Sequence, residues 1–207
     1  MAEMSISSLR GKWAQGIQPR HFTWILKDQI AVCERLGGKG SNHRPVRRQE
    51  EIVWVLNNNF DLTISLIPGN HNLQAYKDLG LAHRHWPVSD DHEPTFLLPR
   101  IYEQMGIAIE HNKTMLMHRL TLGDTVMGFF GGFLIWGDYL SKPTETFVMV
   151  ERLFGRQIGP RGRSMINTIY ESDHRKANLP VIDPDAEIAE EIEGAEITDE
   201  LADESEG

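Results

Sequence analysis

Cysteine is nearly missing from this sequence of 207 residues, which contains only Cys33. A single cysteine excludes an intramolecular disulfide framework and a cysteine-rich zinc site. Long apolar runs are also missing, because the nearest, Val126 to Trp136, is interrupted by glycines and is shorter than the roughly 18 residues of a membrane span. The N-terminus lacks the compact apolar core of a signal peptide. We therefore expect a cytoplasmic protein that does not cross a membrane.

Basic residues are absent from the C-terminal end. Of 30 acidic residues, 12 lie from Pro180 onward, so 18 remain against 21 Lys and Arg in the rest of the chain, which carries about +3. The tail has no aromatic residues and cannot bury enough surface to offset chain entropy. We expect a weakly ordered segment at 1–20, one domain at 21–178 and a disordered acidic tail at 179–207. The tail is either a solvating segment or an arm that competes for a basic groove.

Between these ends the hydrophobic pattern alternates between strands and helices. The hydrophobic content of 40% and charged content of 25% fit a globular domain. Strands separated by helices predict an α/β fold, with a mainly parallel sheet covered by helices on both faces and a helical C-terminal half. The expected strands are 22–26, 29–33, 61–67, 81–88 and 114–119, and the expected helices include 46–58, 72–79, 96–112 and 125–140.

The segment from Met115 to Gly128 carries the clearest functional signal. An apolar strand runs into His118, a short polar turn with one glycine follows, and a long apolar helix comes next. The backbone N–H groups and dipole at a helix N-terminus can hold an anion. The candidate ligand-binding residues are therefore His118, Arg119, Leu120, Thr121, Leu122, Gly123, Asp124 and Thr125.

These residues resemble the cysteine-dependent dual-specificity and tyrosine phosphatases, whose signature is His-Cys, five residues and then Arg. Arg119 stands where the nucleophilic cysteine belongs, and Asp124 where the phosphate-binding arginine belongs if one loop residue is deleted. The resemblance implies a three-layer phosphatase-like domain over residues 20–176. It is supported by the segments Trp24 to Val32, Glu51 to Leu66, Phe147 to Phe154 and the helix after Gly159-Pro160, which are similar to the entry hairpin, an early helix and strand, and the two C-terminal helices of the family.

The stretch from His85 to Pro94 resembles the general-acid loop of the same family, with Asp90 best aligned to the acid and Asp91 as the alternative. In these enzymes a thiolate attacks phosphorus. The guanidinium of Arg119 cannot replace it, because it is cationic and has no available lone pair. We therefore expect no cysteine catalysis. The resemblance then points to a pseudophosphatase that binds a phosphorylated ligand, a phosphoprotein or another protein partner.

Alternatives for the loop remain open at this point. Asp124 can be a helix cap or first-turn residue while Arg119 neutralises a neighbouring acid, or the loop can retain a phosphate site. A third possibility is a hydrolase of phosphate monoesters in which Asp124 or Asp90 acts on an activated or metal-bound water. A purely structural interaction module is a further hypothesis, so enzymatic activity is undecided.

Cofactors and nucleic acid are not indicated. The spacing of His83, His85, His92 and His118 matches no compact metal motif, and no cofactor is expected. A basic segment could guide a phosphorylated ligand, but it is small and lacks the interleaved aromatic residues typical of nucleic-acid binding. Its members are Lys39, His43, Arg44, Arg47 and Arg48.

Overall fold

The strands form one sheet in which parallel pairs predominate. The computed structural model of the chain describes residues 15–38, 45–89 and 94–172. Its strands are β1 (Thr23–Leu26), β2 (Ile30–Glu34), β3 (Leu62–Ser65), β4 (His83–His85) and β5 (Met115–Arg119). Their order in the sheet is β1-β2-β5-β3-β4, with β1 antiparallel to β2 and the other neighbours parallel. Strand β5 is therefore central. Its neighbours β2 and β3 are parallel to it, so the carboxyl ends of the three strands lie at the same edge of the sheet.

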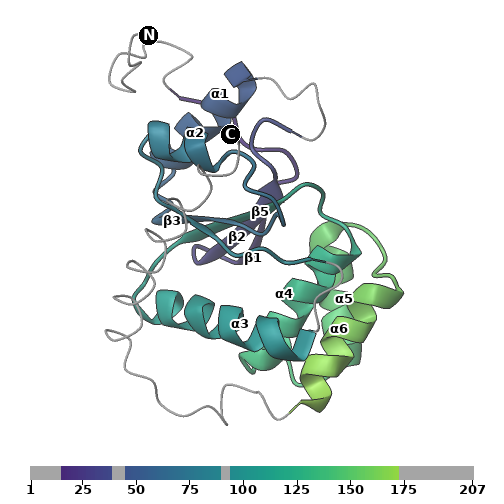
Figure 1. Cartoon of the computed structure of the whole chain (residues 1–207). Coiled ribbons are helices and arrows are strands. Elements are labelled where there is room, and N and C mark those ends of the chain that lie inside the picture. The colour runs from purple at the N-terminus through teal and green to yellow at the C-terminus, as the bar shows by residue number, and fades with distance from the viewer. Residues whose placement is uncertain (1–14, 39–44, 90–93, 173–207) are drawn as a thin grey trace, which may run out of the picture. The chain divides into compact units, whose positions relative to one another are not determined.

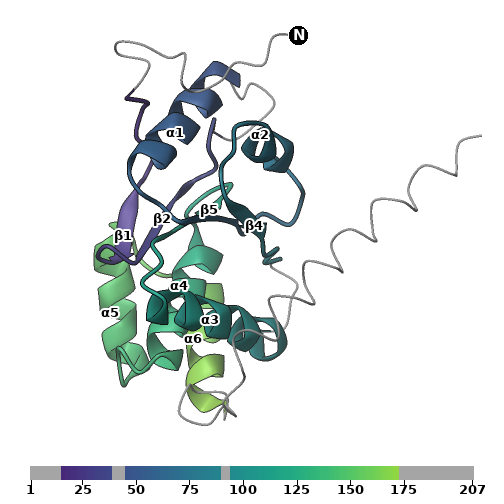
Figure 2. The same ribbon diagram turned by 90° about the vertical axis from the view of Figure 1, so that its left-hand side faces the viewer.

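Helices cover both faces of this sheet (Figure 1). One face carries α1 (Pro45–Asn57) and α2 (Leu73–Asp78), and the other carries α3 (Pro94–Glu110), α4 (Asp124–Trp136), α5 (Pro143–Phe154) and α6 (Pro160–Glu171). The perpendicular view in Figure 2 shows the same three layers. The mainly parallel sheet, the two helical layers and the helical C-terminal half confirm the predicted fold class.

Several elements are shorter than their hydrophobic patterns predict, and the strand expected at 61–67 keeps only Leu62–Ser65. The helix expected at 125–140 ends at Trp136, because Gly137 follows and Asp138 turns the chain with a left-handed φ of 57°. The strand expected at 81–88 keeps only His83–His85. Backbone hydrogen bonds still continue past this short strand on either side of Pro87, from the Trp86 N–H to the Ser65 carbonyl at 2.9 Å and from the Val88 N–H to the Leu66 carbonyl at 3.2 Å.

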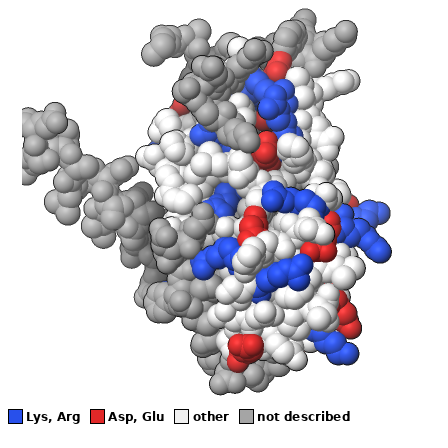
Figure 3. All heavy atoms as spheres, turned by 90° about the vertical axis from the view of Figure 1, so that its right-hand side faces the viewer, with Lys and Arg blue, Asp and Glu red and all other residues white. Residues whose placement is uncertain are grey.

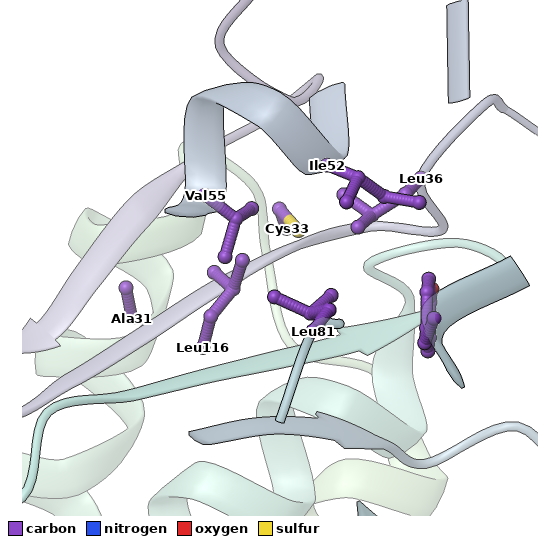
Figure 4. Close-up of a cluster of buried hydrophobic side chains, with 8 residues drawn as sticks. Ala31, Cys33, Leu36, Ile52, Val55, Leu81 and Leu116 are labelled. Atoms are coloured by element: carbon purple, nitrogen blue, oxygen red, sulfur yellow. The ribbon is translucent and has the colours of Figure 1, made fainter. Parts of the chain in front are cut away.

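An apolar cluster joins the first helical layer to the sheet (Figure 4). Cys33 and Ala31 from β2 and Leu116 from β5 meet Ile52 and Val55 from α1. Partly buried aromatic rings close this core at one side, and their contacts are mostly edge to face. These rings belong to Phe22, Trp24, Trp54 and Phe60.

Helix α4 is the buried element of the second layer, and α6 packs closely against it. A Cβ added to Gly128 of α4 would meet the Cα of Gly162 at 2.7 Å and the Sδ of Met165 at 2.9 Å. The close approach therefore requires glycine at position 128. This packing explains why α4 contains Gly128, although glycine lowers the stability of an isolated helix. This contact also brings the start of α4 near the start of α6.

The chain divides into two units, Met1–Ala177 and Asn178–Gly207, and the second lies outside the described residues. In the first unit, Ile17 is already bonded to α1, because its backbone N–H donates to the Glu50 carbonyl at 3.0 Å. None of the described helices is long and apolar enough to cross a membrane. On the face shown in Figure 3, Lys and Arg side chains are interspersed with acidic ones, so neighbouring charges partly offset one another.

Candidate functional site

The structure has the strand, loop and helix that the sequence predicts around His118. Strand β5 ends at Arg119, residues 120–123 form the loop, and α4 begins at Asp124 with Gly123 as its N-cap. Leu120 and Thr121 are exposed, whereas Thr125 is buried in the first turn of the helix. The loop therefore lies at the carboxyl edge of the sheet, where ligands of parallel sheets commonly bind.

His118 is fully buried under α2 and is held in the neutral form. Its Nε2 lies 2.9 Å from the hydroxyl of Tyr76, which also accepts a hydrogen bond from Asn72 Nδ2 at 3.4 Å. The phenol oxygen has capacity to donate to Nε2 or to accept from it, according to the imidazole tautomer, and His118 Nδ1 is buried with no hydrogen-bond partner among the described residues. Burial, with smaller contributions from Arg35 and His85, lowers the pKa of His118 to about 3. His118 is therefore a fixed neutral hydrogen-bonding group near neutral pH.

Arg119 is the last residue of β5 and is partly exposed. Its carbonyl accepts a hydrogen bond of 2.7 Å from the backbone N–H of Arg35, which ties the start of the loop to the end of β2. A guanidinium can hold an oxyanion through its planar donors but cannot attack phosphorus. Arg119 therefore has the chemistry to bind an anion but not to attack phosphorus.

The carboxylate of Asp124 contacts the start of α6. One carboxylate oxygen accepts from the backbone N–H of Gly159 at 2.7 Å, and the other accepts from Gly162 at 2.9 Å. Gly159 is the N-cap of α6 and has no side chain to cap that helix. Asp124 is thus a first-turn residue of α4, as one of the predicted alternatives has it. Its side chain caps a different helix, α6.

Cys33 pairs in register with His118 but has the wrong chemistry for a nucleophile. The Cα atoms of the two residues are partners in the β2–β5 ladder, and both side chains are buried. Burial, together with the charges of Glu51 and Glu34, raises the pKa of the Cys33 thiol well above its usual value. A raised thiol pKa beside a lowered imidazole pKa cannot give the thiolate–imidazolium pair of a cysteine–histidine site. Cys33 is a core residue.

A polar network next to His118 was missed by the sequence reasoning. Asn72, which adopts a left-handed φ of 74° before α2, donates to the Leu36 carbonyl at 2.7 Å and accepts from Arg48 Nη1 at 3.2 Å. Arg35 lies in the same region and is 7% exposed. The available signal was a charged residue at the end of a buried strand, Arg35, followed by Leu36 and two glycines.

The remaining candidates are outside this network or outside the described chain. Asp90, Asp91 and His92 lie beyond the described residues, as do Lys39, His43 and Arg44. His83 Nδ1 lies 2.9 Å from the Leu81 carbonyl, and His85 Nε2 lies 2.7 Å from the Ile67 carbonyl. Among the residues that the structure describes, no group of three His, Cys, Asp or Glu side chains could hold a metal ion.

Comparison with known proteins gives one clear result. No family model matches the sequence, and no curated protein matches it. Solved structures do match, beginning with a kinase-associated phosphatase whose catalytic cysteine is replaced by serine, at a TM-score of 0.57 and 16% identity over 74% of this chain and 94% of that one. The fold is that of the dual-specificity and tyrosine phosphatases.

Two further structures agree. A variant of human DUSP28 has a TM-score of 0.55 and 16% identity, covering 75% of this chain and 96% of its own. The core catalytic domain of the PP-IP phosphatase SIW14 from S. cerevisiae has a TM-score of 0.55 and 16% identity, covering 86% of this chain and 96% of its own. At these identities the shared property is the phosphatase fold, and function must be argued from the side chains.

Proposed function

We propose that this phosphatase-like domain is a pseudophosphatase. It binds a phosphorylated ligand or a phosphorylated protein partner at the loop 118–125 without covalent cysteine chemistry. The strand–loop–helix arrangement at the carboxyl edge of the sheet supports the binding half of the proposal. The ligand class is a phosphate monoester or a phosphorylated side chain.

The observation that carries the proposal is the identity of position 119. In the phosphatases that share this fold, the residue after the signature histidine is the cysteine that attacks phosphorus. Here Arg119 follows His118, and the single cysteine is buried in the core with a raised thiol pKa. Loss of a nucleophile that acts together with other groups costs about 10⁴ to 10⁶ in kcat. Of the two steps of the phosphatase reaction, phosphate binding and attack on phosphorus, these residues retain the groups for binding alone.

The other charged group of the loop supports the same conclusion. Both oxygens of Asp124 accept backbone hydrogen bonds from α6, so the carboxylate is committed to a structural contact. A carboxylate nucleophile or base would have to face the ligand within hydrogen-bond reach. The geometry of Asp124 therefore favours a binding site over a carboxylate-based hydrolase.

Two measurements on the full chain test the proposal. Inorganic phosphate and phosphotyrosine should each raise the melting temperature, since a ligand at a hundred times its Kd stabilises a protein by about 2.7 kcal/mol. Hydrolysis of para-nitrophenyl phosphate, with and without Mg²⁺ or Zn²⁺, should stay at the level of the Arg119→Ala control.

Each alternative has its own outcome in these measurements. Turnover that disappears in Asp124→Asn or Asp90→Asn but survives in Cys33→Ser would identify a carboxylate-based phosphate-monoester hydrolase. No stabilisation by phosphate, vanadate or phosphotyrosine would identify a purely structural interaction module. Either result would replace the pseudophosphatase proposal.

A further inference from the structure

Arg35 is a buried cation at the carboxyl end of β2. Its side chain is 7% exposed, and among the described residues it makes one hydrogen bond, from Nε to the Gly38 carbonyl at 2.8 Å. The terminal guanidinium nitrogens, Nη1 and Nη2, therefore have donors left over. An arginine in this setting is unusual, because buried charges in proteins are normally paired.

The carboxylates of this region are already bonded to other groups. Glu51 accepts from the backbone N–H of Gly37 at 2.6 Å and from Arg47 Nε at 2.7 Å. Glu34 lies 3.4 Å from His21 Nδ1. Both acids thus have partners other than the guanidinium of Arg35.

The groups that do act on Arg35 are a phenol and a second cation. Burial lowers the pKa of Arg35, the nearby hydroxyl of Tyr76 opposes that shift, and the charge of Arg48 adds to it. The guanidinium still remains protonated at neutral pH. In the part of the chain that the structure describes, no carboxylate is bonded to the Arg35 guanidinium, and the neutral side chains of Tyr76 and His118 do not compensate its charge.

Arg35 also stands beside the loop of the candidate site. Its backbone N–H donates to the carbonyl of Arg119, and the residue before it, Glu34, is the register partner of Arg119. The neighbouring backbone is open, since a Cβ on Gly38, where φ is +86°, would meet no described atom within 4 Å. Arg35 itself is bonded through its backbone to the first part of the proposed binding loop.

We propose that the guanidinium of Arg35 is a cationic group that binds the phosphate oxyanion of the ligand. This inference rests on the proposed function and adds a residue to the same site. The fold's usual anchoring cation is missing here, because Asp124 occupies the matching position of the loop. A guanidinium at the end of β2 supplies the planar donors that suit a phosphate group.

The test is titration of the full chain with inorganic phosphate at constant ionic strength, by calorimetry. Arg35→Met should weaken phosphate binding about ten- to a hundredfold, the range of one lost hydrogen-bonded ion contact. Arg35→Lys, which keeps the charge without the planar fork, should retain part of the affinity. The matched control is Lys113→Met, which removes one cation from an exposed pair with Asp61, near the opposite end of β5.

Melting in phosphate-free buffer separates a lost ligand contact from a damaged fold. Because Arg35→Met removes a buried charge to which no described carboxylate is bonded, it should melt no more than about 3 °C below Lys113→Met. A much larger drop would show that Arg35 is a structural residue and would overturn the inference. Wild-type affinity in Arg35→Met would also overturn it while leaving the proposed function standing. If the wild type binds no phosphate, the proposed function falls and this inference falls with it.

Discussion

The carboxylate of Asp124 should hold α4 and α6 together, and Asp124→Ala should therefore destabilise the fold. Its two hydrogen bonds, of 2.7 and 2.9 Å, satisfy the amides of Gly159 and Gly162 at the start of α6. Hydrogen bonds to a charged group contribute about 1.5–3 kcal/mol each, and loss of a helix cap costs about 0.5–2 kcal/mol. Two such bonds at the lower figure sum to about 3 kcal/mol, and because Asp124 is half-buried we expect a loss of about 2–3 kcal/mol.

Urea and thermal unfolding measure this loss. For a chain of this size, 1 kcal/mol corresponds to about 2–4 °C, so Asp124→Ala should melt about 4–12 °C below wild type. Asp124→Asn should lose less, because one amide oxygen can still accept. The control Asp138→Asn, at an exposed position with a left-handed φ that asparagine tolerates, should change stability by less than about 0.5 kcal/mol. An Asp124→Ala protein as stable as that control would refute the capping role.

Three further changes test the buried parts of the site. The pKa of His118 is about 3 in the folded chain and about 6.5 in the unfolded chain, so the unfolded state binds the proton first as the pH falls. The free energy of unfolding should therefore fall by about 1.4 kcal/mol per pH unit below pH 6.5. In urea unfolding, the drop in stability of His118→Gln between pH 7 and pH 4.5 should be about 2–3 kcal/mol smaller than that of the wild type. The Cys33 thiol should resist an aromatic disulfide reagent in the native chain and react fully in urea, so fast native labelling would contradict its core role. Gly128→Ala should cost about 1–3 kcal/mol because its Cβ meets Gly162, whereas Gly106→Ala, whose nearest neighbour lies at 3.4 Å, should be tolerated in the same melts.

The layers of the fold could be predicted from the sequence because they depend on local periodicity. Continuous apolar runs such as Met115 to Met117 specify buried parallel strands, and a helix as apolar as α4 must be covered on most of its surface. Element ends were less predictable. The apolar residues Tyr139 and Leu140 extend the helical pattern past Trp136. The helix nevertheless ends at Trp136, because Gly137 and Asp138 between them favour a turn.

The contacts within the candidate site could not be predicted in the same way, because they join residues far apart in the chain. The partners of Asp124 lie 35 and 38 residues away, and they reach it only because α4 and α6 pack through Gly128. The bond between His118 and Tyr76 spans 42 residues. Spacing within a motif can suggest that a loop binds an anion, but it cannot say which way each side chain of the loop points.

The direction of Asp124 also decides whether the loop can hold a phosphate. A carboxylate about 4 Å from a phosphate would repel it by about 4 kcal/mol per unit charge at an effective dielectric constant near 20, which would abolish useful affinity. Both oxygens of the carboxylate are instead bonded to backbone N–H groups at the start of α6. Asp124→Ala, assayed at a temperature where the variant is still folded, should therefore bind inorganic phosphate within about threefold of wild type. If the variant lost binding while keeping wild-type stability, Asp124 would have to face the ligand, and the binding loop would need a different cation geometry from the one that Arg35 provides.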